Sequence, residues 1–196
     1  VIPVYPPLAQ EQAISSTKAP EIQGRKKKDK SQPVELSFYP EGGELVEEMP
    51  TRVAVRAEDK MGNPLNIAGR IVDAFGTEIC QFETYQKGMT TFPLKPAAGQ
   101  RYKAEVQWEG ATLSYSLPAP LEEGFGLQTR FRGEDLILTL RSNLNSGLEG
   151  AYLLGHLRGQ VFCRVESLAG PMQRLKVPLT DVSEGVAHFT LFDRSN

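Results

Sequence analysis

Apolar and polar residues alternate with a period of two along most of this chain. The clearest case is a pair of runs, 102–108 and 111–117, that flank Glu109-Gly110. Two alternating runs around a short turn that contains glycine predict a β-hairpin with one apolar face. That face would carry Tyr102, Ala104, Val106, Trp108, Ala111, Leu113, Tyr115 and Leu117. Because Trp108 lies on this face, we expect it to pack in a core rather than to stack on a sugar ring at the surface.

Similar short runs recur on both sides of this hairpin, separated by turn residues such as glycine, proline and asparagine. They occupy residues 34–38, 53–57, 68–74, 78–83 and 89–94 before it, and 125–131, 136–140, 151–157, 160–165, 175–179 and 186–192 after it. No segment keeps a period of 3.6 over about ten residues, so we expect no substantial helix. Many short strands at regular spacing predict an all-β fold of the β-sandwich type.

A proline-rich segment divides these strands into two groups. Leu117-Pro118-Ala119-Pro120 removes two backbone donors and stiffens the chain. We therefore expect two tandem immunoglobulin- or fibronectin-like antiparallel β-sandwiches, at residues 33–118 and 119–196. Residues 1–32 fit neither sandwich: residues 1–5 are typical of a strand that ends a preceding domain, and an extended linker follows them.

The charge and hydropathy of the chain indicate which classes of partner to expect. The chain of 196 residues has 22 basic and 24 acidic residues and a net charge of −2, so we expect no nucleic-acid partner. No apolar run reaches the roughly 18 residues that a membrane span needs. The basic run at 25–30 is open to interpretation as a nuclear address or a nucleic-acid arm. We favour a solvated linker, because no aromatic residue is interleaved with these charges.

The residue types that carry chemistry are few and scattered. Cys80 and Cys163 have no CxxC context and no histidine at ligand spacing, so we expect two unpaired, mostly buried thiols. His156 and His188 have no partners at the spacing of a catalytic triad or a zinc site. We expect hydrogen-bonded histidines on strands. The sequence thus predicts no catalytic residue, no cofactor and no metal site, and a protein that is not an enzyme.

One segment resembles a known family. The run FYPEGGELVEEMPTRVAVRAEDKMGNPL, residues 38–65, is similar to a recurring segment of large macroglobulin-like proteins of Bacteroidetes. In that segment an FPEGG element precedes a strand and a D-x-x-G-x-P loop. Residues 152–159 and 185–193 resemble the domain that usually follows, and the resemblance covers about residues 33–193. We expect Gly42-Gly43 to serve the structure, because glycine tolerates positive φ at a turn.

The resemblance implies tandem macroglobulin (MG) domains, with an MG2-type domain upstream, inside alpha-2-macroglobulin-like or TonB-associated envelope proteins. It also implies that the chain is part of a longer protein located in the periplasm or at the outer membrane. The other domains of the parent protein would be its partners. Protease-trapping members carry a Gly-Cys-Gly-Glu-Gln thioester, and neither Cys80 nor Cys163 has that context.

Two functions remain open from the sequence. The first is a non-catalytic structural or interaction module that works by inter-domain or protein–protein contacts. The alternative is a carbohydrate- or peptide-binding module associated with TonB-dependent nutrient uptake, with a protein, peptide or glycan as its ligand. For that alternative the candidate ligand-binding residues are Tyr39, Tyr85 and Tyr152.

Overall fold

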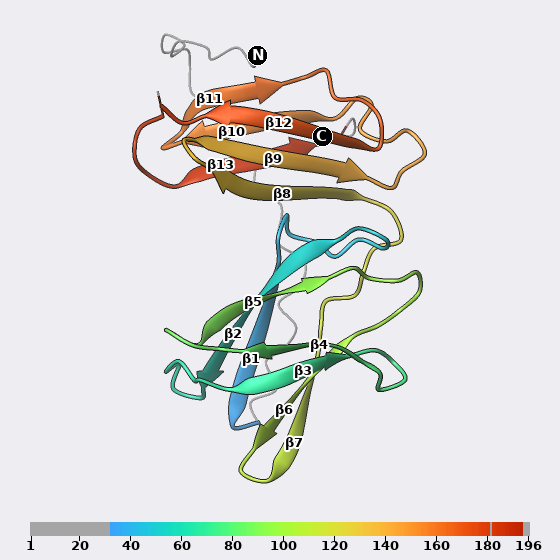
Figure 1. Cartoon of the computed structure of the whole chain (residues 1–196), viewed down its shortest axis with the longest axis vertical. Helices are drawn as coiled ribbons and strands as arrows, with labels where there is room; N and C mark the ends of the chain where they lie inside the picture. The colour runs from blue at the N-terminus through green and yellow to red at the C-terminus, as the bar shows by residue number, and fades with distance from the viewer. Residues whose placement is uncertain (1–31, 181, 194–196) are drawn as a thin grey trace, which may run out of the picture.

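The computed structural model describes residues 32–180 and 182–193, and these residues form strands, turns and loops without any helix. Every strand pairs antiparallel with its neighbours (Figure 1). The strands are β1 (Val34–Pro40), β2 (Thr51–Asp59), β3 (Ala68–Val72), β4 (Glu78–Glu83), β5 (Met89–Leu94), β6 (Lys103–Trp108), β7 (Ala111–Ser116), β8 (Phe125–Arg132), β9 (Asp135–Ser142), β10 (Tyr152–Leu157), β11 (Gln160–Val165), β12 (Met172–Pro178) and β13 (Ala187–Phe192).

The first sandwich packs a sheet of order β1-β2-β5 against a sheet of order β4-β3-β6-β7. Its core follows from the alternation in the sequence: Val53, Val55 and Phe92 of the first sheet are at most 1% exposed. The predicted hairpin is β6–β7, in which Trp108 pairs with Ala111 across the turn. Trp108 is partly buried and packs against this core, as its position on the apolar face predicts.

The second sandwich repeats this plan. One sheet has the order β12-β9-β8 and the other has the order β11-β10-β13. Leu138, Leu140 and Leu153 at its centre are fully buried. The strand order matches that of the first sandwich, except that no described residue forms a neighbour for β13 on the side away from β10. The expectation of two tandem antiparallel β-sandwiches is confirmed.

Strand β3 in the first sandwich and strand β10 in the second each carry a glycine that faces the core. A Cβ atom added to Gly69 of β3 would lie 2.6 Å from the Phe82 ring, and one added to Gly155 of β10 would lie 2.8 Å from the Phe189 ring. In both places the missing side chain lets an aromatic ring of the adjacent strand lie over the backbone. The two sandwiches therefore share a packing device as well as a strand order.

The remaining structural expectations have mixed outcomes. Cys80 is half-buried, Cys163 is buried, both are free, and burial raises the pKa of each thiol, as expected for inert cysteines. The predicted terminal strand at residues 1–5 and the basic run at 25–30 lie outside the described residues. The described part of the chain has no helix of the length and apolarity that a membrane span requires.

Candidate functional site: the joint between the two sandwiches

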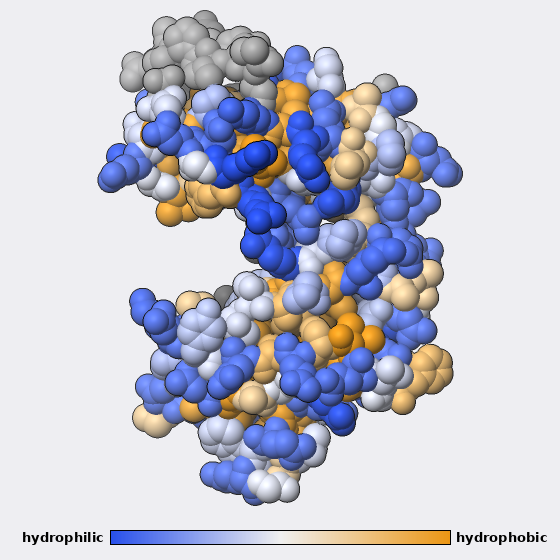
Figure 2. All heavy atoms as spheres, in the orientation of Figure 1, coloured by the Kyte–Doolittle hydropathy of each residue, from blue (hydrophilic) through white to orange (hydrophobic). Residues whose placement is uncertain are grey.

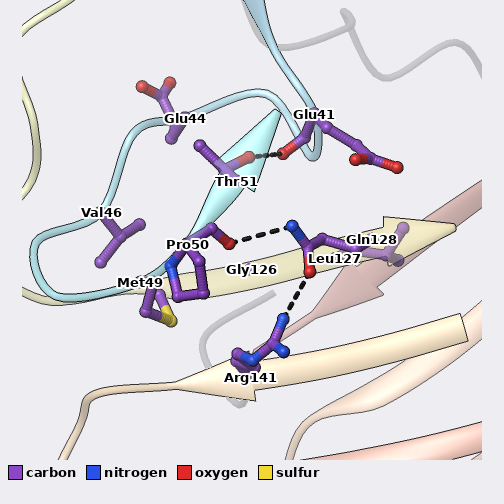
Figure 3. A pocket seen from close by; sticks show the side chains of 10 residues that line it. All are labelled: Glu41, Glu44, Val46, Met49, Pro50, Thr51, Gly126, Leu127, Gln128 and Arg141. Atoms are coloured by element: carbon purple, nitrogen blue, oxygen red, sulfur yellow. Dashed lines mark hydrogen bonds between the residues drawn. The ribbon is translucent and has the colours of Figure 1, made fainter. Parts of the chain in front are cut away.

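The loop that connects β1 to β2, residues 41–50, lies against β8 and makes the main contact between the sandwiches (Figure 3). Figure 2 shows the two bodies meeting along one side, with an open notch on the other. The cavity left between the loop and β8 holds only about 10 Å³, the space of about one water molecule. The joint is therefore a packed contact and not a ligand pocket.

An ion pair forms the centre of this joint. Glu41 follows β1 and Arg52 lies in β2, and Nε and Nη2 of Arg52 each donate to the Glu41 carboxylate at 2.9 Å. The carboxylate is mostly covered, with 18% of its side chain exposed, whereas the Arg52 side chain is 55% exposed. A planar guanidinium that donates two parallel hydrogen bonds fixes the orientation of both side chains.

The same two side chains bind the backbone of the second sandwich. Oε1 of Glu41 accepts the Thr129 N–H at 2.8 Å and its hydroxyl at 3.1 Å, while Nη2 of Arg52 donates to the Thr129 carbonyl at 2.9 Å. Thr129 lies in β8, which pairs on one side with β9 and has no strand on its other side among the described residues. The ion pair thus accepts from the N–H and donates to the C=O of one edge residue, as the backbone of an adjacent strand would. It covers an edge that would otherwise be open to pairing.

The hydrogen bonds also set the charge state of Glu41. Partial burial by itself raises the pKa of its carboxyl. The hydrogen bond and charge of Arg52 and the hydrogen bonds from Thr129 outweigh that effect, so that the pKa lies below its ordinary value of 4.5. Glu41 is ionised at neutral pH, and the joint depends on that charge.

Backbone contacts reinforce the ion pair. Val46 and Leu121 form a parallel bridge, in which Glu47 N–H donates to the Leu121 carbonyl at 2.9 Å and Leu121 N–H donates to the Leu45 carbonyl at 2.8 Å. Leu121 belongs to the segment that connects the sandwiches. Leu45 and Val46 are buried, so this bridge anchors the connecting segment to the apolar part of the first sandwich.

Two amide side chains of the second sandwich complete the joint. Gln128 donates to the Pro50 carbonyl at 2.9 Å and accepts a hydrogen bond from Arg141 (Figure 3). Asn143 donates to the Glu47 carbonyl at 3.2 Å, and its own oxygen accepts Gly124 N–H at 2.8 Å. Both amides therefore satisfy backbone groups of loops that are not paired in a sheet.

The backbone conformation and close packing of Gly42 explain why the FYPEGG run has a glycine at this position. Its φ is +92°, and a Cβ atom there would lie 3.0 Å from the oxygen and 3.1 Å from the nitrogen of Leu127 in β8. Any side chain would thus push the loop away from the strand that Glu41 binds. Gly43 has a φ of +100° with open space around it, so it serves the turn alone. Both glycines have the structural role that the sequence predicts.

The three tyrosines proposed as ligand contacts lie on different elements. Tyr39 is 56% exposed near the end of β1, and Tyr85 is 59% exposed after β4, where it bridges to Met89. Tyr152 begins β10 and stacks on Phe192 with the ring centroids 4.8 Å apart. In the described part of the chain no ring contact joins any two of these tyrosines, and their role in binding stays a prediction.

The histidines differ from the expectation. His156 of β10 and His188 of β13 are paired in register and stack with their centroids 5.0 Å apart. Nδ1 of His156 is buried without a hydrogen-bond partner, so ring stacking takes the place of the expected hydrogen bond there. Within residues 32–180 and 182–193, no three His, Cys, Asp or Glu side chains are grouped in a way that would hold a metal ion.

The sequence analysis assigned no role to Arg52 or Thr129, and it included Glu41 only as part of the FYPEGG run. Arg52 and Thr129 are separated by 77 residues along the chain. No periodicity brings them together. The only local signal is Gly42, whose missing side chain allows a close approach of two backbones but does not indicate which strand the second one belongs to.

No protein-family model matches the chain, and no curated protein matches it in sequence. Among solved structures, the chain is similar to the native conformation of E. coli alpha-2-macroglobulin, with a TM-score of 0.32 and 10% sequence identity. The similarity covers 83% of this chain and 14% of that chain, so this chain spans about one seventh of the length of that protein. The similarity concerns at most a macroglobulin-like fold and carries no argument about activity, partners or location.

Proposed function

We propose that the tandem sandwiches are a non-catalytic structural and interaction module of a larger macroglobulin-like protein of the cell envelope, in the periplasm or at the outer membrane. The module works through inter-domain and protein–protein contacts, and its task is to hold two surfaces in one fixed arrangement. The Bacteroidetes and TonB association rests on the sequence resemblance alone, which covers about residues 33–193.

The observation that carries this proposal is the contact of Glu41 and Arg52 with Thr129. A flexible tether between two sandwiches needs no such contact, because domain surfaces joined by a linker tend to be polar and to move independently. Here a mostly covered carboxylate is matched to one residue of a sheet edge, and Gly42 allows the backbones to approach. Such complementarity favours a joint of defined angle.

Small-angle X-ray scattering tests this proposal. The wild-type chain is expected to give a profile that one arrangement of the sandwiches fits, and that stays the same between low and moderate salt. A variant with Arg52→Ala and Glu41→Ala is expected to need a broad distribution of arrangements with a larger mean radius of gyration. A wild-type profile as broad as that of the variant would contradict the proposal.

The alternative function, a carbohydrate- or peptide-binding module for nutrient uptake, draws support from the exposed rings of Tyr39 and Tyr85. Exposed aromatic rings can stack on sugar faces. An NMR titration with soluble glycans and peptides decides this alternative, because binding would shift the signals of these rings and Tyr39→Ala or Tyr85→Ala would weaken it. If no glycan or peptide shifts the signals of these rings, the alternative function is excluded.

A further inference from the structure

The sheet β4-β3-β6-β7 of the first sandwich has a polar hollow on its outer face. Its volume is about 240 Å³, somewhat below the roughly 300–1,000 Å³ of pockets that hold drug-sized ligands. The residues that line it come from three adjacent strands: Ala68, Gly69 and Arg70 of β3, Gln81 of β4, and Glu105 and Gln107 of β6. The hollow is therefore of a size to hold one small ring.

The hollow follows from the register of the three strands. Arg70 pairs with Gln81 on one side and with Glu105 on the other, which puts three long polar side chains in one row across the sheet. Ala68 lies two residues before Arg70 and so on the same face of the sheet. Its side chain is a single methyl group, and it is exposed. Ala68 and the backbone of Gly69 thus leave a low, partly apolar floor beside longer polar side chains.

Neighbouring side chains hold the polar groups around this floor. Nε and Nη2 of Arg70 both donate to Oε2 of Glu105, at 3.1 Å and 2.9 Å. The amide nitrogen of Gln81 donates to Oε1 of Glu78 at 2.8 Å. The amide nitrogen of Gln107 donates to Oγ1 of Thr112 at 2.9 Å. Groups that are already held in place lose less conformational entropy when a ligand binds.

Each of three rim residues keeps one oxygen for a ligand. In the described part of the chain, no hydrogen bond reaches Oε1 of Gln81, Gln107 or Glu105. Nη1 of Arg70 has only a contact of 3.8 Å with Glu78. The hollow therefore offers three acceptors and one donor around its floor. Hydroxyl groups match such a set, because each one both donates and accepts.

The charges of the hollow favour a neutral ligand. Arg70 and Glu105 neutralise each other in an ion pair, and the Glu105 side chain is 25% exposed. A carboxylate or phosphate on the ligand would face Glu105 and the nearby Glu78. An ammonium group on the ligand would face Arg70. Like charges brought together in this way oppose binding of either kind of ion.

We propose that this hollow binds one ring of a neutral saccharide. The C–H face of a pyranose ring lies on Ala68 and Gly69, and its hydroxyl groups bond with the free oxygens of the rim and with Arg70. The hollow is distinct from Tyr39, Tyr85 and Tyr152, the residues of the alternative function. It shares no residue with the joint at Glu41, so the structural proposal and this one can fail separately.

NMR titration of the full chain tests the proposal with glucose, galactose, mannose and N-acetylglucosamine as neutral probes. At least one of them is expected to shift the side-chain amide signals of Gln81 and Gln107 and the backbone amides of Ala68 and Gly69. The dissociation constant is expected in the millimolar range, because the ligand is small and the site is open to solvent. Glucuronate and glucosamine have the same ring with one added charge, and they are expected to bind more weakly.

Two variants and a control locate the site. Ala68→Gln fills the floor with a longer neutral side chain and is expected to abolish the shifts; since Ala68 is exposed, the variant is expected to fold normally. Gln107→Ala removes one acceptor and is expected to weaken binding roughly fivefold, the effect of one hydrogen bond. Ser116→Gln is the matched control, because Ser116 is exposed, pairs with Lys103 and lies outside the hollow. It is expected to bind like the wild type.

Several results would overturn the proposal. One is the absence of shifts at the hollow with all four neutral sugars, in a chain whose spectrum shows that it is folded. Shifts that persist in Ala68→Gln, or tighter binding of glucuronate or glucosamine than of every neutral sugar, would do the same. Shifts confined to the tyrosine rings would assign sugar binding to the alternative function and not to this hollow.

Discussion

Replacing Glu41 by alanine removes the acceptor on which the joint depends. The carboxylate accepts two hydrogen bonds from Arg52 and two from Thr129. Because the Arg52 side chain is 55% exposed, its ion pair is treated as a surface pair that contributes about 0.2–1 kcal/mol. The Thr129 N–H then loses its acceptor, at a cost of about 1–3 kcal/mol for a covered donor. Since Thr129 is half-buried, the lower part of that range applies, and the total is about 2 kcal/mol.

Hydrogen exchange of the Thr129 amide, followed by NMR, measures this loss directly. A change of about 2 kcal/mol in local opening corresponds to exchange that is roughly 30-fold faster. Amides in the centre of β9, such as that of Leu138, are expected to keep their wild-type rates, because the variant opens the joint and does not unfold the second sandwich.

Glu44→Ala is the matched control. Glu44 lies in the same loop, lines the same contact and carries the same charge, but it is exposed and no hydrogen bond from it to β8 occurs in the described part of the chain. It is expected to leave exchange at Thr129 unchanged. Equal exchange rates at Thr129 in Glu41→Ala and in the wild type would refute the reasoning, because the carboxylate would then contribute nothing to covering the edge of β8.

Further predictions concern pH and the two cores. Folding lowers the pKa of Glu41, so the stability that its carboxylate gives the joint is complete above the ordinary value of 4.5 and is lost as the pH falls through the lower folded value. NMR signals of Thr129 should show the joint opening in that pH range. Glu41→Gln should abolish this pH dependence. Thr84→Val should lower the free energy of unfolding in urea by about 1–3 kcal/mol, because the buried Thr84 hydroxyl accepts Ile67 N–H at 2.9 Å, and a loss within experimental error would argue against that bond. Gly155→Ala should cost about 1–3 kcal/mol in the same assay, since its Cβ would lie 2.8 Å from Phe189; an unchanged midpoint would show that the ring moves aside freely.

The strands could be predicted because successive side chains of a β-strand point to opposite faces, so a strand with one buried face shows a period of two in its own sequence. Each strand has one face toward a core. In the hairpin of β6 and β7 the apolar positions from Tyr102 to Leu117 are buried or half-buried except Ala111, which is exposed. The sequence likewise predicts a break between the two groups of strands at Pro118, since proline interrupts pairing. These features depend on neighbours in sequence, and sequence therefore suffices for them.

The joint could not be predicted because it depends on neighbours in space. Glu41 and Thr129 are 88 residues apart, and nothing local to either residue indicates the other. The same holds for the stacking of His156 on His188: alternation places each ring on the outer face, but only the register of β10 with β13 brings the rings together. Which edges are covered and which stay open is likewise a property of the strand order.

Residual dipolar couplings, collected for amides of both sandwiches in one weakly aligned sample, test the central claim most directly. A fixed joint predicts that couplings from β1–β7 and from β8–β13 fit a single alignment tensor with the arrangement of Figure 1. Two tensors of clearly different magnitude would mean that the sandwiches move independently. The contact of Glu41 and Arg52 with Thr129 would then not hold them in one arrangement.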